Sequence, residues 1–347
     1  MAFEFGPVQA SEQPDLIRFL VKSFDADPAL TSFRPDVIHW KYFAEHPQWT
    51  GPRSFVVKRD GQIVAHGGVW PVILRTPQAD VKAMHLIDWA ASRSAVGAGV
   101  HLLRVMTGLA DVLLTIGGSQ DTRNVLPKLG YKRCGELRRY ARVIRPWLQL
   151  RTTPAKNWKT PLKFLRNSAR VMGGVPRVPD GWQAAKVPSF TGSFEAGNVG
   201  ETASSTSPRR TADELDYLLN CPAARFSGFV VTQADKLRGY FVLAQVGGQT
   251  RIVDIRLDRD DPESWQAICA LATRSAGEDP ATCEIVVASS IGASEKAWLQ
   301  AGFIHRETEP ILCYDPRNRL RPESPLNLNL ADGDSCFLSD PFCPYLS

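Results

Sequence analysis

The 347-residue sequence has no long apolar run and no strong charge of either sign. Its longest apolar candidate, 109–116, is interrupted by Asp111 and falls short of the roughly 18 residues that a membrane helix needs, so we expect no transmembrane segment. The formal net charge of +5 is small for this length, and we expect no nucleic-acid partner. Residues 1–5 contain no basic region, and we expect no secretory signal.

The seven cysteines are scattered, and none forms a C-x-x-C pair. An odd number without paired spacing is typical of a reduced cytoplasmic protein rather than a disulfide or zinc scaffold. The six histidines lie far from the cysteines in sequence, so we expect no metal site. The sequence also has no P-loop, Ser/His/Asp motif or dinucleotide fingerprint.

What the sequence does contain is the composition of a globular protein, with 44% hydrophobic and 22% charged residues. Its length favours two domains. Apolar spacing and turn residues predict helices and strands in a fixed order: helices at 14–24 and 35–46, a hairpin over 54–70, a strand at 83–89, a helix ending near 109, a strand at 112–116, a helix at 124–129 and a strand at 138–144.

This order of elements repeats later in the chain. A helix at 214–220, a hairpin that begins at Phe229, a strand at 250–257, a helix at 262–276 and a strand at 283–288 follow in the same sequence. We therefore predict an α/β (α+β) protein of two tandem domains, each a mixed, mostly antiparallel twisted sheet flanked by helices. The predicted division is 1–146, a linker with one amphipathic helix at 147–210, a second domain at 211–316, and a surface tail at 317–347.

The most specific segment joins the strand that ends near Trp89 to the helix that follows Gly99. Its residues between Ala90 and Val100 are mostly small, and no acidic residue occurs from Trp89 to Ala110. Small side chains let a ligand approach the backbone, and free amides at a helix N-terminus attract a phosphate-like anion. The alternative is a tight strand-to-helix turn that needs its glycines for geometry alone.

The order of elements and this loop resemble the GNAT acyltransferases, which carry Arg/Gln-x-x-Gly-x-Gly/Ala at their pyrophosphate loop. The matching stretch here is Ser94-Ala95-Val96-Gly97-Ala98-Gly99: both glycines match, and Ser94 replaces the basic or amide residue. The Trp40-Lys41-Tyr42 stretch, the strand of Asp88 and the ending Lys128-Leu129-Gly130-Tyr131 look like a bacterial branch associated with cell-surface polysaccharides. The resemblance covers 3–144 and, more loosely, 213–314.

The resemblance implies direct transfer, in which an amine attacks the thioester of acetyl-CoA or another acyl-CoA without a metal. It places the diphosphate on Ser94, Ala95, Val96, Gly97, Ala98, Gly99 and Val100. It places the pantetheine arm on the backbone of Trp89, Ala90 and Ala91. Asn124 is a further cofactor contact. The Tyr that the family often uses as an acid corresponds to Leu126, which cannot donate a proton, and Asp88 is the nearest candidate base, with a structural role as the alternative.

The corresponding junction of the second half has no glycine. It carries Asp258, Asp260, Asp261 and Glu263 where phosphates would have to approach, and Asp261 followed by Pro262 predicts a self-capped helix. We therefore expect no CoA in this half. Three functions remain open: an N-acetyltransferase for an amino sugar or another small amine, a catalytically silent tandem-GNAT binding protein, and a Fem-type aminoacyl transferase. The linker, with tryptophans and basic residues around its helix, either packs on a neighbour or touches a membrane surface or an anionic glycan.

Overall fold

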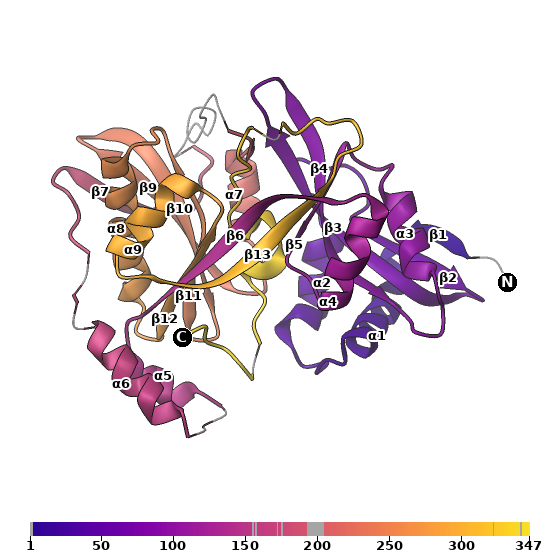
Figure 1. Ribbon diagram of the computed structural model, residues 1–347, viewed down its shortest axis with the longest axis horizontal. Helices are drawn as coiled ribbons and strands as arrows, with labels where there is room; N and C mark the ends of the chain where they lie inside the picture. The colour runs from indigo at the N-terminus through magenta and orange to yellow at the C-terminus, as the bar shows by residue number, and fades with distance from the viewer. Residues whose placement is uncertain are drawn as a thin grey trace.

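The structure is a computed structural model that describes residues 3–154, 156, 158–171, 173–174, 176–192, 205–321, 323–340 and 342–347. Within these residues one 13-stranded sheet runs through the molecule in the order β1-β2-β3-β4-β5-β13-β6-β12-β11-β10-β9-β7, with β8 on β3 (Figure 1). No helix in the described part of the chain is long and apolar enough to cross a membrane.

The first half forms the β1-to-β5 end of the sheet. Its β2, β3 and β4 are antiparallel, whereas β5 lies parallel to β4. The Asp60-Gly61 turn that joins β2 to β3 has positive φ at both residues, as the hairpin prediction requires. The bounds are β1 Glu4–Pro7, α1 Gln13–Phe24, α2 Pro35–Tyr42, β2 Ser54–Arg59, β3 Gln62–Arg75, β4 Asp80–Ala91, α3 Ala98–Met106, β5 Val112–Ile116, α4 Gln120–Val125 and β6 Lys132–Val143.

The second half repeats this arrangement. Its β9, β10 and β11 are antiparallel, and β12 lies parallel to β11. The bounds are β7 Trp182–Val187, β8 Ser207–Pro208, α7 Ala212–Leu219, β9 Arg225–Gln233, β10 Lys236–Val246, β11 Gln249–Leu257, α8 Pro262–Glu278, β12 Glu284–Ser289, α9 Gly292–Gln300 and β13 Ile304–Tyr314. The two halves therefore have matching topologies, as the repeated order of elements predicts.

The two halves exchange their last strands. β6 of the first half pairs with β12 of the second, and β13 of the second half lies between β5 and β6. Figure 1 shows β6 and β13 running side by side across the middle of the molecule. The division at residues 146 and 211 stays a prediction about domain boundaries, but the sheet of each half ends on a strand from the other.

A disulfide joins these exchanged strands, between Cys134 on β6 and Cys313 on β13, with a Cα–Cα distance of 6.1 Å. The prediction of reduced rather than disulfide-bonded cysteines is wrong at this pair. The two residues are 179 positions apart, so their spacing gave no sign of the pairing. The cytoplasmic location stays a prediction, and a disulfide counts against the reducing compartment that it assumes.

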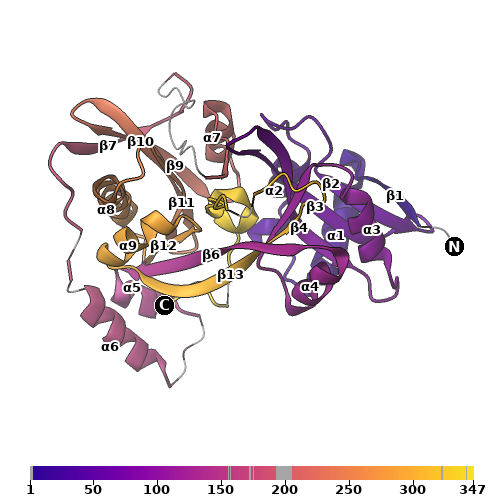
Figure 2. The ribbon, with the colours of Figure 1, turned by 45° about the horizontal axis from the view of Figure 1, so that its top comes forward.

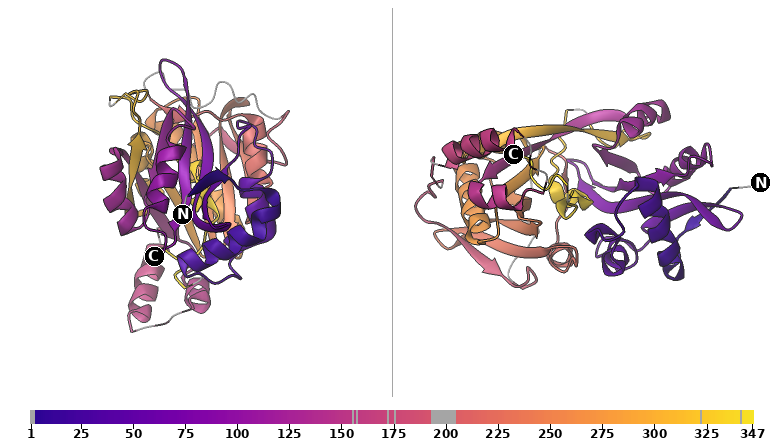
Figure 3. Two further views of the ribbon diagram at one scale, coloured as in Figure 1. Left: turned by 90° about the vertical axis from the view of Figure 1, so that its right-hand side faces the viewer. Right: turned by 90° about the horizontal axis from the view of Figure 1, so that it is seen from below.

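The C-terminal segment 317–347 is predicted at the surface, but its stretch 326–337 is mostly buried. Leu328 and Cys336 are fully buried, Leu330 is 1% exposed and Phe337 is 2% exposed. The segment packs into the apolar cluster that joins α1 and α2 to strands of both halves. Figures 2 and 3 show it, in yellow, lying between the two halves. The stretch is part of the core, because its leucines pack in one cluster with residues of both halves.

The linker contains the predicted amphipathic helix as α6, Thr160–Val171, preceded by α5, Pro146–Thr152, which the sequence analysis did not find. Strand β7 also falls in this region and pairs with β9. Part of the loop predicted at 188–208 lies outside the described residues.

Candidate functional site

Strand β4 carries an irregularity where it approaches α3. The pairing with β3 shifts between His66 and Gly68, and Asp88 opposite this shift has a φ of 46°. A non-glycine residue in this conformation is uncommon and indicates that neighbouring contacts hold it. On the other edge, the parallel pairing of β4 with β5 ends at His85 and Leu114, although β4 continues to Ala91. The end of β4 is therefore free of β5.

The loop from Ser92 to Gly97 connects this free end to α3. Gly97 is the N-cap residue of α3 and has a φ of 85°, a conformation that favours glycine. Gly99 has a different reason for its small size: a Cβ there would lie 3.0 Å from the Cβ of Ala91. The Trp89 indole N–H also donates to the Gly99 carbonyl at 3.1 Å, so α3 is fixed closely against β4.

The backbone amides of this loop fall into two groups. Those of Ala95 and Ala98 donate to Ser92 O and Ala95 O at 3.0 and 3.1 Å, and both residues are buried. Within the described residues no hydrogen bond engages the remaining amides of the segment, those of Ser94, Val96, Gly97, Gly99 and Val100. Ser94, Val96 and Gly97 are exposed, Val96 by 90%. Unbonded amides at the start of a nine-residue helix can bind an anion.

Asp88 lies on the opposite face of β4 from α3 and belongs to a buried ionic cluster. Lys41 Nζ of α2 lies 2.5 Å from a carboxylate oxygen of Asp88 and 2.5 Å from one of Asp334, and the Tyr42 hydroxyl also donates to Asp88. The Lys41 side chain is only 2% exposed, whereas that of Asp88 is 20% exposed. Two carboxylates share one ammonium, so the cluster has a formal charge of −1.

The cluster sets the protonation of its members. Burial alone would raise the pKa of Asp88, but the charge of Lys41 and hydrogen bonds from Lys41 and Tyr42 outweigh burial and hold this pKa below its usual value. Burial and the Asp88 charge raise the pKa of Tyr42 well above its usual value. Asp88 is therefore an anion at neutral pH, and Tyr42 is a neutral phenol that donates to it.

Two buried histidines complete the surroundings of β4. His66 lies between the Asp88 carbonyl and the Ser54 hydroxyl, at 2.9 Å from each. His85 lies between the Asp332 carbonyl, 2.9 Å away, and the Ile116 amide, 3.2 Å away. Because the Ile116 N–H donates to Nε2, the His85 ring is neutral and donates from Nδ1 to Asp332. Burial lowers the pKa of both rings, that of His66 to about 4.

Because His66 is neutral and buried, the free energy of unfolding should change with pH in the acid range. The ring is protonated near pH 6.5 in the unfolded chain and near pH 4 in the folded one, so its contribution is intact above pH 6.5 and declines as the pH falls towards 4. Over that range we expect the free energy of unfolding of a His66→Gln variant to fall less steeply than that of the parent, by up to about 1.4 kcal/mol per pH unit. Urea unfolding at a series of pH values measures both slopes.

The variant must be compared with the parent because Glu214 changes the free energy of unfolding with pH in the opposite direction to His66. Burial raises its pKa to about 7, so its contribution is present at acid pH and is lost as the pH rises through 7. Equal slopes for the parent and the His66→Gln variant would contradict a neutral His66 in the folded state.

Two other predicted positions lie on or beside α4. Leu126 is fully buried at the start of a 3-10 helix, so no acid acts from this position. Asn124 is exposed and accepts a hydrogen bond from the Gln120 side chain at 3.0 Å. The assignments of Asn124 and of the loop residues to a cofactor stay predictions.

The equivalent junction of the second half is closed by its own side chains. Asp261 caps α8 by accepting from the Ser264 amide at 3.0 Å, Asp260 accepts from the Trp265 indole at 2.6 Å, and Asp258 pairs with Arg238. The predicted N-cap is thus confirmed. A cavity of about 30 Å³ remains beside this junction, next to Trp265 and Ile291. Acidic side chains occupy the helix start, which disfavours an anion there.

Lys41 and Asp334 belong to this site, although neither is among its predicted residues. Lys41 and Tyr42 stand in the Trp40-Lys41-Tyr42 stretch that the family resemblance rests on, so their proximity to Asp88 had a signal. Asp334 had none, because it reaches Lys41 across 293 positions of sequence.

No family model and no curated protein matches the chain. Several solved structures are similar to the chain. A tandem GNAT protein from the clavulanic acid biosynthesis pathway aligns at 13% identity and a TM-score of 0.57, over 90% of this chain and 98% of that one. N-myristoyltransferase of Saccharomyces cerevisiae, solved with bound myristoyl-CoA and inhibitors, aligns at 12% identity and a TM-score of 0.60, over 99% and 85%. A GCN5-related N-acetyltransferase from Anabaena variabilis aligns at 10% identity and a TM-score of 0.58, over 90% and 73%.

These identities are low, and the shared feature is the fold. One arrangement occurs twice along the sheet: antiparallel strands followed by one parallel pair, with flanking helices. The parallel pair is β4–β5 in the first half and β11–β12 in the second. The chain has a tandem GNAT-like fold.

Proposed function

We propose that the chain is an acyl-CoA-dependent acyltransferase whose acceptor is a small amine, such as an amino sugar, and whose acyl donor is acetyl-CoA. The observation that carries the proposal is the set of unbonded amides at Ser94, Val96, Gly97, Gly99 and Val100, at the start of α3 and beside the free end of β4. These amides would hold the diphosphate of CoA. The backbone of Trp89, Ala90 and Ala91 would hold the pantetheine arm and polarise the thioester carbonyl.

In the proposed reaction the amine nitrogen attacks the thioester carbon, the C–S bond breaks, and CoA leaves as a thiolate. Because the pKa of Asp88 is lowered, this carboxylate is a weak base. Its proposed part is to accept a hydrogen bond from the water that takes the amine proton. Leu126 cannot protonate the thiolate, and we propose that solvent does so.

Thiol release with acetyl-CoA and a panel of small amines tests this function. We expect CoA release that requires the amine. In an Asp88→Asn variant kcat should fall about tenfold or more, with acetyl-CoA affinity within a few-fold of the parent, because Asp88 lies on the opposite face of β4 from α3. The matched control is Asp36→Asn, an exposed carboxylate of α2, which should leave kcat unchanged.

A second candidate function is binding without turnover. The buried Leu126 and the replacement of Arg/Gln by Ser94 favour it, because both remove groups that the GNAT pattern places at the cofactor. Tight acetyl-CoA binding without thiol release for any amine would support this candidate over the transferase.

A further inference from the structure

The segment from Pro146 to Pro179 contains cations and no acidic residue. Its seven positive residues are Arg151, Lys156, Lys159, Lys163, Arg166, Arg170 and Arg177. Subtracting these seven charges from the chain's net +5 leaves −2, so the rest of the protein is slightly acidic. The net positive charge of the chain therefore comes from one tenth of its length, and we expect a partner of this segment to be anionic.

The segment forms a pair of helices that extends beyond the sheet. Figure 1 and the left view of Figure 3 show α5 and α6 together at the lower margin of the molecule. Asn167 of α6 is 2% exposed and donates to the Gln149 side chain of α5 at 3.0 Å. Phe164 contacts Trp147 edge to face, with ring centroids 5.9 Å apart. Asn167 and Phe164 therefore form the inner face of α6.

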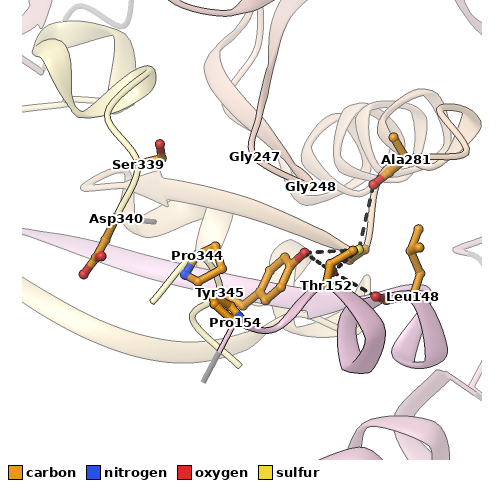
Figure 4. A pocket seen from close by; sticks show the side chains of 11 residues that line it. Leu148, Thr152, Pro154, Gly247, Gly248, Ala281, Ser339, Asp340, Pro344 and Tyr345 are labelled. Atoms are coloured by element: carbon orange, nitrogen blue, oxygen red, sulfur yellow. Dashed lines mark hydrogen bonds between the residues drawn. The ribbon is translucent and has the colours of Figure 1, made fainter. Parts of the chain in front are cut away.

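The C-terminal residues hold this pair of helices in place. In Figure 4 the Tyr345 hydroxyl points at Thr152 of α5, and the two hydroxyl oxygens are 2.6 Å apart. The same hydroxyl lies 3.4 Å from Cys283 Sγ. The Ser347 hydroxyl accepts from Gln149 at 2.9 Å. The helix pair is attached on its inner side, so the orientation of its outer side is fixed.

The outer side of α6 combines an apolar stripe with a basic one. Leu162, Leu165 and Ala169 follow each other at the spacing of one helix face, and the two leucines are 60% and 64% exposed. Lys163, Arg166 and Arg170 have the same spacing one position later, and all three are exposed. The tryptophans Trp147 and Trp158 are 63% and 76% exposed.

The charges of this basic stripe act on the residues around them. Burial, and then the positive charges of Arg166 and Arg170, lower the pKa of Arg306. The surface thus presents exposed positive charge beside exposed apolar side chains, which water solvates poorly. A polyanion such as RNA or a glycan would satisfy the charges but would leave the leucines exposed. A lipid bilayer with anionic headgroups satisfies both, because its interface takes leucine and tryptophan and its headgroups attract lysine and arginine.

We infer that the outer side of α5 and α6 is a membrane-binding surface that docks the protein on an anionic lipid bilayer. The two stripes of α6 insert at the boundary between headgroups and acyl chains, with Trp147 and Trp158 beside them. The inference is independent of the acyltransferase function, since it uses none of the residues of β4 or α3.

Co-sedimentation of the full chain with vesicles tests this surface. We expect binding to vesicles of phosphatidylcholine mixed with phosphatidylserine, little binding to phosphatidylcholine alone, and weaker binding as the salt concentration rises. The triple variant Lys163→Gln, Arg166→Gln, Arg170→Gln should bind the anionic vesicles about a hundredfold more weakly, since each cation contributes roughly fivefold. The control is Lys22→Gln, Lys236→Gln, Arg259→Gln, which has the same net charge with exposed changes elsewhere and should bind within about threefold of the parent.

A second variant distinguishes a bilayer from a polyanion. The pair Leu162→Ser, Leu165→Ser keeps every charge and should weaken vesicle binding about tenfold or more. Circular dichroism and thermal unfolding confirm that each variant is folded. Equal binding to neutral and anionic vesicles, no binding to anionic vesicles, or a leucine variant that binds as tightly as the parent would overturn the inference. The last result, together with tight binding to heparin, would identify a polyanion surface instead.

Discussion

A Gly97→Asp substitution should weaken acetyl-CoA binding at least tenfold, whereas Gly97→Asn should leave it within a few-fold of the parent. Gly97 has a φ of 85°, and Asn and Asp both tolerate this conformation better than other side chains do. A Cβ at this position would meet no atom within 4 Å, so neither side chain is excluded sterically. The two variants have nearly the same shape and differ in charge.

The expected difference follows from the distance of the new charge to the diphosphate. A carboxylate about 4 Å from a phosphate costs roughly 1 to 4 kcal/mol, depending on how much water screens the pair. It also occupies the helix start, as Asp261 does in the second half. Titration calorimetry of the parent and the two variants measures the effect. Similar affinities for the Asp and Asn variants would contradict the assignment of the diphosphate to this loop.

An Arg210→Met substitution should lower the free energy of unfolding by about 3 to 5 kcal/mol, the largest stability effect that we expect from one side chain. Arg210 contacts three carboxylates, two of the second half and one of the C-terminal segment: Asp254 at 2.7 Å, Glu214 at 3.1 Å and Asp332 at 2.5 Å. The Arg210 side chain is 6% exposed and that of Asp254 is fully buried. Methionine fills similar space but removes this cation, and Asp254 keeps the more distant Arg256 at 3.8 Å.

Two comparisons separate charge from packing in this prediction. Arg209→Met changes the neighbouring arginine, which is 37% exposed and pairs with Asp80 at 3.0 Å, and should cost about 1 kcal/mol or less. Adding Asp254→Asn to Arg210→Met removes one of these carboxylate charges and should restore part of the lost stability. Urea unfolding measures all three variants. A loss from Arg210→Met no larger than that from Arg209→Met would contradict a charge-dependent attachment of the C-terminal segment to the second half through Arg210.

Local signals in the sequence located most elements of the fold. The strand 112–116 and the helix α8 start where residue patterns placed them, and Asp261 caps α8 as its position before Pro262 predicts. The fold class follows from the same signals, because the order of elements repeats. These features depend on contacts between residues close in sequence, which periodicity and capping residues report directly.

Contacts between distant segments were not predictable in the same way. β13 pairs with β5 and β6 across the molecule, and nothing in its own residues distinguishes that partner from β12. The alternation of Leu326, Leu328 and Leu330 with asparagines is a period-two signal that could have identified a buried segment in the tail. Its contacts with both halves, and the pairing of Asp334 with Lys41, depend on the assembled sheet.

In the candidate site, too, features that depend on local contacts were predictable and those that depend on distant segments were not. The sequence indicated roles for the glycines of the loop and for the acidic residues of the second half, because each of them acts on the backbone next to it. The environment of Asp88 was not predictable, because its pKa and its hydrogen bonds depend on α2 and on the C-terminal segment. The sequence allowed either a base or a structural role for Asp88, and in the structure this carboxylate is held by Lys41 and Tyr42.

The measurement that tests the central claim most directly is a titration of isotope-labelled protein with CoA, followed through its backbone amide resonances. We predict that the amides of Ser94, Val96 and Gly97 shift strongly and saturate together, and that the Ser264 amide at the start of α8 does not move. Unchanged resonances from Ser94 to Val100 at saturating CoA would contradict a diphosphate site at α3, and a saturable shift of Ser264 would contradict the closure of the second half.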